Sequence, residues 1–124
     1  MSEWQSKSDY EINAAVTSFI HGCEKWDLND AEFYHCGIDG SGYFSQPILD
    51  YCNNPSDAWP IIVENKISIH HDIARYSASS LVYDKKFENG FKVFNYNGEI
   101  GDISSRAALR AAMIVYLEMN GVKP

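Results

Sequence analysis

An alanine-rich segment near the C-terminus limits most strongly what this chain can fold into. Ser104 or Ser105 can cap a helix there, and Gly121 stands where a left-handed residue would follow its end near Asn120. Alanine favours helix and lets a helix approach a sheet closely. The apolar side chains of this segment fall on one stripe, formed by Ala108, Leu109, Ala112, Tyr116 and Met119. The pattern therefore predicts a long C-terminal helix packed against a sheet.

A second helix is predicted near the N-terminus, over residues 9–21. Ser8 and Glu11 match a capping box, in which the Ser8 hydroxyl accepts a hydrogen bond from a backbone N–H of the first turn. Gly22 can end the helix. Its apolar stripe consists of Ile12, Val16, Phe19 and Ile20.

A short central helix is predicted over residues 56–66. Pro60 is tolerated only in the first turn of a helix, where its missing N–H has no intrahelical partner to lose. We therefore expect the helix to begin near Asp57 to Trp59, with Ile61 and Ile62 at the start of its buried face. The preceding Asn53-Asn54-Pro55 marks a turn and an alternative helix entry.

Strands are predicted between these helices. Residues 32–36 are rich in aromatic side chains, and Ile67 and Ile69 alternate with polar residues. Residues 79–83 and 91–96 are rich in β-branched and aromatic residues, and the Asn89-Gly90 pair between them favours an antiparallel hairpin.

The glycine-rich residues 37–42 are predicted to be a loop. These elements together predict an α+β fold: a small antiparallel sheet packed by an N-terminal helix, a short central helix and a long C-terminal helix. The length of 124 residues fits a single domain spanning residues 1–124.

Charge is divided unevenly along the chain, whose formal net charge is −7. Residues 1–57 hold ten acidic against two basic residues, whereas residues 58–124 hold seven acidic and eight basic ones. An acidic half repels phosphate backbones, which argues against general nucleic-acid binding. It can attract a basic protein surface or imitate nucleic acid. Alternatively, the acidic residues only keep a small domain soluble.

Neither a membrane segment nor a signal peptide is expected. Uninterrupted apolar runs such as Ala58 to Val63 are far shorter than the ~18 residues that a membrane-spanning helix needs. The first residues lack the basic start and apolar stretch of a signal peptide.

The cysteines Cys23, Cys36 and Cys52 form an odd set, which favours free thiols in a reducing cytoplasm. With His21 and His35 they lack the paired spacing of a zinc site. We therefore expect no metal site, no cofactor and no identifiable catalytic residue.

His70-His71-Asp72 is the densest polar cluster, and an imidazole beside a carboxylate can act as a general base. Adjacent strand residues point to opposite faces, however, so the alternative is a solvated strand end. Aromatic residues in loops, notably Tyr43, Phe44 and Tyr76, can instead form a contact patch of the kind found at protein interfaces. The alternative is that the aromatic residues belong to the core or are exposed incidentally. The candidate binding residues are therefore Tyr43, Phe44, Tyr51, Trp59, His70, His71, Asp72 and Tyr76.

Residues 50–67, with the sequence DYCNNPSDAWPIIVENKI, resemble the NinX-like family of small proteins from lambdoid phages and prophages. The sequences DYEIN at 9–13 and AALRAAM at 107–113 extend this resemblance. The family has no established biochemical function and supplies no catalytic residues. The resemblance implies a phage accessory protein in the cytoplasm of an enterobacterial-type host.

Three hypotheses on function follow. The first is a non-enzymatic, acidic interaction module that binds a host or phage protein and inhibits, in its sharpest version, a host defence or nucleic-acid enzyme. The second is a small-molecule-binding protein or minor enzyme, with a pocket near Trp59 and His70-His71-Asp72. The third is a homo-oligomer whose aromatic residues pair its subunits.

Overall fold

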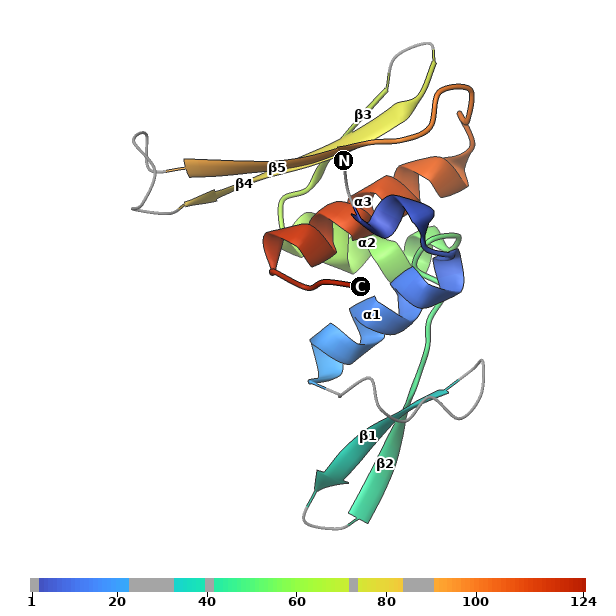
Figure 1. The fold of residues 1–124 in the computed structure, drawn as a ribbon, viewed down its shortest axis with the longest axis vertical. Coiled ribbons are helices and arrows are strands. Elements are labelled where there is room, and N and C mark those ends of the chain that lie inside the picture. The colour runs from blue at the N-terminus through green and yellow to red at the C-terminus, as the bar shows by residue number, and fades with distance from the viewer. Residues whose placement is uncertain (1–2, 23–32, 40–41, 72–73, 84–90) are drawn as a thin grey trace.

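The computed structural model describes residues 3–22, 33–39, 42–71, 74–83 and 91–124, with only the backbone at 33–39, 42–47, 82–83 and 91–92. Along the chain the elements are η1 (Glu3–Ser6), α1 (Asp9–His21), β1 (Phe33–Asp39), β2 (Gly42–Pro47), α2 (Pro55–Glu64), β3 (Ser68–His71), β4 (Tyr76–Tyr83), β5 (Phe91–Asn97) and α3 (Ser105–Met119) (Figure 1). This is the α+β class that the sequence predicts.

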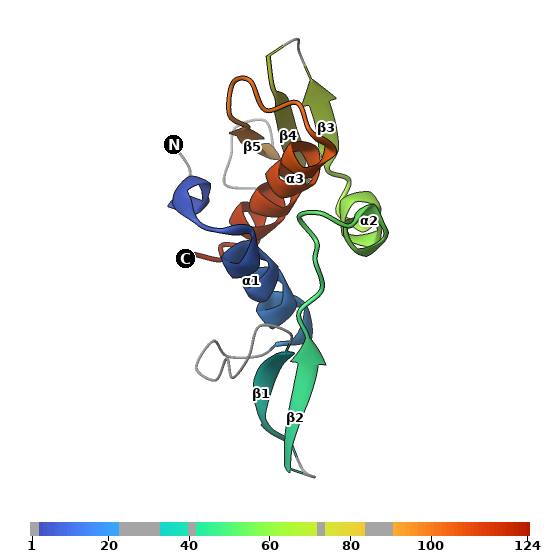
Figure 2. The same ribbon diagram turned by 90° about the vertical axis from the view of Figure 1, so that its right-hand side faces the viewer.

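Helix α3 lies at the centre of the molecule. All residues from Ala111 to Leu117 are buried, which requires that neighbours cover the helix on every side. The sheet covers one side of α3, while α1 and α2 pack against the others (Figures 1 and 2). Leu109, Ala112 and Tyr116 of the predicted stripe are buried, whereas Ala108 and Met119 are partly buried, and the buried surface extends beyond the stripe.

The caps of both long helices are as predicted. The Ser8 hydroxyl accepts from the Glu11 N–H, and the Ser104 hydroxyl accepts from the Ala107 N–H. Gly22, with φ 68°, and Gly121, with φ 72°, hold the left-handed conformation that follows each helix.

The sheet is antiparallel, with strand order β3-β4-β5. Ala78, Ser80 and Tyr96 are buried on the face toward α3, while Leu81 and Val93 pair across the exposed outer face. The predicted strands are confirmed, although β4 begins at Tyr76, earlier than expected. The predicted turn at residues 89–90 lies outside the described residues.

A second hairpin, β1–β2, projects away from the helices at the end of the molecule opposite the sheet (Figures 1 and 2). The strand predicted at residues 32–36 is confirmed from Phe33 onward, but the loop predicted at 37–42 is wrong at both ends. Ile38 pairs with Tyr43, so the strands continue close to the turn. A register shift between His35 and Ile38 allows this, because a bulge accommodates an extra residue that breaks the alternation read from sequence.

Helix α2 begins earlier than expected. The Asn54 side chain accepts from the Ser56 N–H, and Pro55 takes the first helical position. The predicted start near Asp57 to Trp59 is therefore wrong, and Pro60 lies inside the helix. Ser56, whose carbonyl an N–H at position 60 would otherwise contact, is exposed, so water can replace the bond that proline cannot make. The helix ends at Glu64, and Lys66 follows with φ 54°.

Candidate functional site

Helix α2 carries apolar side chains on two faces. Its inner face, Ala58, Ile61 and Ile62, is buried in the core. Its outer face carries Trp59, Pro60 and Val63, at the spacing that places residues on one side of a helix. Trp59 is 61% exposed and Val63 54% exposed. We call these three residues the α2 ridge.

One shallow groove, of about 460 Å³, separates the α2 ridge from β3. It will be called the α2–β3 groove. Its walls are mainly aliphatic, and Lys66 is the charged residue in its lining. Ser68 and Ile69 of the edge strand β3 form the wall opposite α2. The remaining lining residues are Trp59, Ile62, Val63 and Ile67.

A second groove, also of about 460 Å³, lies on the other flank of α2 and will be called the α1–α2 groove. It combines apolar side chains from α1, α2 and α3 with two carboxylates, Asp57 and Glu64. The lining residues are Phe19, Ile20, Leu49, Tyr51, Asp57, Pro60, Ile61, Glu64, Asn65 and Tyr116. Phe19 packs edge-on against Tyr116 with ring centroids 5.7 Å apart. The α2 ridge thus stands between two grooves.

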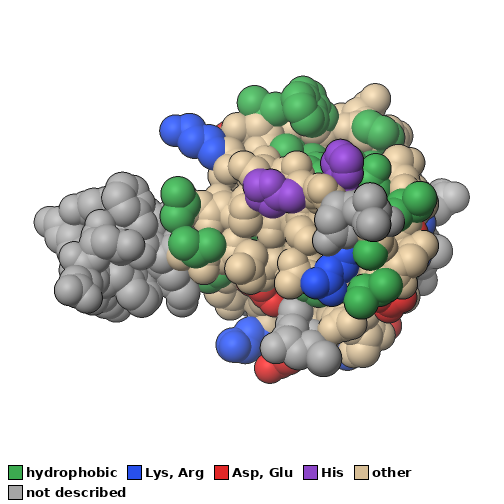
Figure 3. Space-filling model, turned by 90° about the horizontal axis from the view of Figure 1, so that it is seen from above, with side chains coloured by type: hydrophobic (Ala, Val, Ile, Leu, Met, Phe, Trp, Pro, Cys, Tyr) green, Lys and Arg blue, Asp and Glu red, His purple; other side chains and the backbone are tan. Residues whose placement is uncertain are grey.

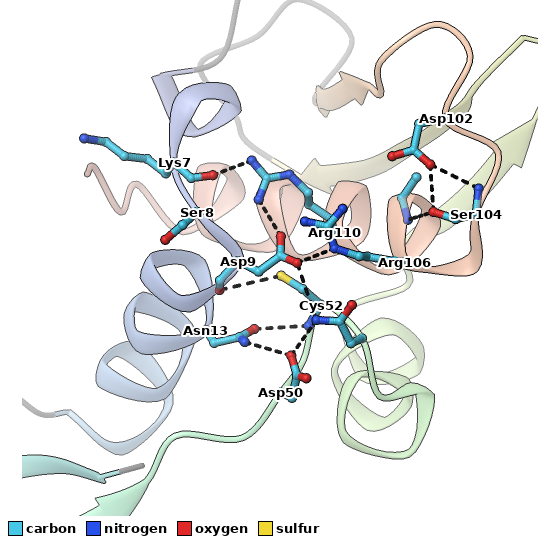
Figure 4. Close-up of polar contacts among 12 residues, drawn as sticks. Lys7, Ser8, Asp9, Asn13, Asp50, Cys52, Asp102, Ser104, Arg106 and Arg110 are labelled. Atoms are coloured by element: carbon cyan, nitrogen blue, oxygen red, sulfur yellow. Dashed lines mark hydrogen bonds and ion pairs between the residues drawn. The ribbon is translucent and has the colours of Figure 1, made fainter. Parts of the chain in front are cut away.

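A buried amide fixes the entry to α2. Asn13, 6% exposed on α1, donates from Nδ2 to Asp50 Oδ1 at 3.0 Å and accepts at Oδ1 from the Cys52 N–H at 3.1 Å (Figure 4). Asn53 donates to the same Asp50 oxygen at 2.9 Å. These bonds hold the segment that leads into α2 against α1, so the position of the α2 ridge is set by the core.

An ion-pair cluster ties the N-terminal segment to α3. The Asp9 carboxylate accepts from Arg106 Nε and, at 2.8 Å, from Arg110 Nη1 (Figure 4). Arg110 Nη2 donates to the backbone carbonyls of Trp4, Gln5 and Lys7. The donors of Arg110 point inward to the chain itself, which makes this cluster a structural clamp.

The Cys52 thiol is buried beside this clamp, with Sγ 4.0 Å from the Asp9 carbonyl. Burial, reinforced by the Asp9 carboxylate, raises the pKa of this thiol to about 12. A thiol that stays protonated is a poor nucleophile. Among the described residues, no three His, Cys, Asp or Glu side chains gather in a group that could hold a metal ion.

The predicted binding residues fall in different places. Trp59 lies at the head of the α2 ridge, whereas Tyr51 is 3% exposed and belongs to the core. Tyr76 does not lie in a loop but opens β4, where it packs edge-on against His71 at 5.7 Å. Its sequence neighbours alternate too weakly in hydrophobicity to show the strand. His70 Nε2 lies 2.9 Å from Ser79 Oγ on the exposed side of the sheet.

The remaining candidates are separated from Trp59 or lie outside the described residues. Tyr43 and Phe44 do not lie in a loop but in β2, at the far end of the molecule from the sheet (Figure 1). Asp72 lies outside the described residues. Sequence reasoning missed Val63, which a check for apolar residues four apart from Trp59 would have found.

Comparison with known protein families shows which family the chain belongs to. A family model described as Bacteriophage P22, NinX matches residues 6–120. The chain belongs to the NinX family. The resemblance noted in the sequence is therefore confirmed, and the NinX match covers both grooves and the α2 ridge. No curated protein and no solved structure gives a significant match. The NinX family is one of phage proteins, and no helix among the described residues is long and apolar enough to cross a membrane.

Proposed function

We propose that this NinX-family chain is a non-enzymatic phage accessory protein that binds a host or phage protein through the α2 ridge. One observation carries the proposal: Trp59 is 61% exposed on a helix whose other face is buried in the core. Exposed tryptophans on preorganised elements are the side chains that most often dominate protein interfaces. Seen from above, hydrophobic side chains reach the surface in several separate groups (Figure 3).

Charge supports a protein partner of opposite sign. The chain carries a formal net charge of −7, so long-range attraction favours a basic surface and disfavours nucleic acid. Asp9 and Asp50 are engaged in internal bonds, whereas Glu11 and Asp57 remain on the surface to steer a partner. Inhibition of a host defence or nucleic-acid enzyme in the host cytoplasm is the sharpest form of this function.

The proposal is tested by capture from host lysate with three forms of the full chain. Wild type is compared with Trp59→Ala/Val63→Ala and with Leu81→Ala/Val93→Ala, which removes a similar exposed apolar pair from the sheet. A protein retained by wild type and by the sheet variant, but lost by at least about thirtyfold from the ridge variant, is the expected result. Equal retention by all three forms would overturn the proposal.

A second candidate function is a small-molecule site or minor enzyme near Trp59 and His70-His71-Asp72. The 2.9 Å contact between His70 Nε2 and Ser79 Oγ favours it, although the α2–β3 groove beside Trp59 is lined by neither His70 nor His71. His70→Ala/His71→Ala tests it, since an unchanged phage phenotype in a folded variant removes the idea.

Sizing of the wild-type chain in solution tests the third candidate, a homo-oligomer.

A further inference from the structure

The α1–α2 groove has a chemistry that the proposed function leaves unused. Phe19, Ile20 and Leu49 are each more than a third exposed along it, and Pro60 of the α2 ridge forms its edge. An apolar groove between helices is the geometry that accepts the apolar face of another helix.

Two carboxylates mark this groove as acidic. Asp57 and Glu64 lie seven residues apart on α2, a separation of about 10 Å along the helix axis. No lysine or arginine stands among the described residues that line the groove. Within the part of the chain that is described, the ion pairs involve Asp9 alone among the acids, so neither groove carboxylate has a cationic partner.

Burial and these carboxylates raise the pKa values of two tyrosines that line the groove. The pKa of Tyr51 is raised by burial and further by Asp57, while the pKa of Tyr116 is raised by burial and further by Glu64. Both negative charges therefore act across the groove that Tyr51 and Tyr116 line, one toward each end of α2.

We infer that the α1–α2 groove binds a basic amphipathic helix of the protein partner. The apolar face of that helix covers Phe19, Ile20 and Leu49, and lysine or arginine residues two turns apart meet Asp57 and Glu64. This inference rests on the proposed function, because it names the partner segment that lies beside the α2 ridge. The same carboxylates repel anionic lipid and nucleic acid, which leaves a cationic polypeptide as the occupant.

The test uses a fluorescent peptide of two lysine-flanked heptads, with leucine at helical spacing, and measures its anisotropy with the full chain. A peptide with the same leucine pattern and glutamate in place of lysine is the control ligand. Asp57→Asn/Glu64→Gln removes both groove charges. Glu3→Gln/Glu99→Gln removes the same charge at exposed positions outside the groove and is the matched control variant.

We expect the lysine peptide to bind the wild type and the control variant alike, and the glutamate peptide to bind neither. The groove variant should bind about three- to thirtyfold more weakly at low salt, with the difference shrinking as salt rises. Equal weakening by both charge variants, no effect of the groove variant, or no binding of the lysine peptide to wild type would overturn the inference.

These outcomes are separable from failure of the proposed function. If the Trp59→Ala/Val63→Ala variant loses a captured partner that Asp57→Asn/Glu64→Gln retains fully, the α2 ridge is the interaction surface and the groove inference is wrong. If both variants lose that partner while Leu81→Ala/Val93→Ala keeps it, the proposed function and the inference both stand.

Discussion

At the scale of single residues, the buried Asn13 fixes the position of the candidate site, although Asn13 itself lies outside the site. Its amide joins α1 to the Asp50 carboxylate and to the Cys52 N–H, and the chain then runs directly into α2. A buried amide with partners on both its oxygen and its nitrogen specifies one geometry, because any displacement leaves polar groups unpaired. Asn13 was not predicted from sequence, since a helical asparagine within an apolar pattern gives no sign of a partner 37 residues away.

Replacing Asn13 by alanine should destabilise the fold. Asn13→Ala leaves the buried Cys52 N–H without its acceptor, which costs about 2–3 kcal/mol of unfolding free energy. Asn95→Ala makes the same chemical change at an exposed position and should shift stability by less than about 0.5 kcal/mol. Urea unfolding followed by circular dichroism measures both. Similar stability of the two variants would contradict the role given to Asn13.

The Cys52 thiol should be unreactive until the chain unfolds. Its pKa of about 12 in the fold lies above the ordinary value of 9.0, so the thiolate is scarce at pH 8 and the group favours the folded state below pH 9. That contribution is lost as pH rises from about 9 toward 12. In a Cys23→Ser/Cys36→Ser background, we expect Ellman's reagent to label Cys52 far more slowly in the native protein than in urea. Rapid native labelling would show that the thiol is accessible.

At the scale of elements, α2 shows where sequence reasoning succeeds and fails. The helix itself and its buried residues Ile61 and Ile62 follow from the apolar spacing. The start of the helix does not follow from the apolar spacing. Asn54 caps the helix and Pro55 takes its first position, whereas the sequence argument placed Pro60 in the first turn. The cost of an interior proline is offset by tertiary packing, which a propensity argument does not include.

Pro60→Ala should stabilise α2. The change restores an N–H at an interior helical position and removes a residue that disfavours helix, partly offset by the greater freedom of the unfolded chain. We expect the free energy of unfolding to rise by about 1 kcal/mol. Thermal unfolding measures the change. A fall in stability would argue that Pro60 occupies a helical first turn after all.

The strands show the same division between local and tertiary information. Strands β3, β4 and β5 were predicted because β-branched and aromatic residues mark them. Strand β2 was not predicted. Its pairing with β1 depends on a bulge next to Gly37, and no local sequence pattern indicates that bulge. The candidate site divides likewise. Trp59 was predicted and Val63 follows from helical spacing, but the place of Leu49 in the α1–α2 groove depends on how the helices pack.

At the scale of the whole molecule, the central position of α3 explains how so small a chain holds an exposed apolar ridge in place. The helix is covered by the sheet on one side and by α1 and α2 on the others, so its neighbours share a single core (Figure 2). Helix α2 is held by that core on its inner face and leaves its outer face to solvent. The α2 ridge therefore stands on a well-packed support, which would lower the entropic cost of the binding that we propose.

Hydroxyl-radical footprinting of the chain alone and with its captured partner tests the role of the α2 ridge most directly. Trp59 is 61% exposed and Trp4 is 2% exposed, so Trp4 serves as an internal reference that stays protected in both states. We predict that oxidation of Trp59 and Val63 falls strongly in the complex while that of Leu81 and Val93 does not change. Unchanged oxidation of Trp59, with new protection of Leu81 and Val93 on the sheet, would contradict the account.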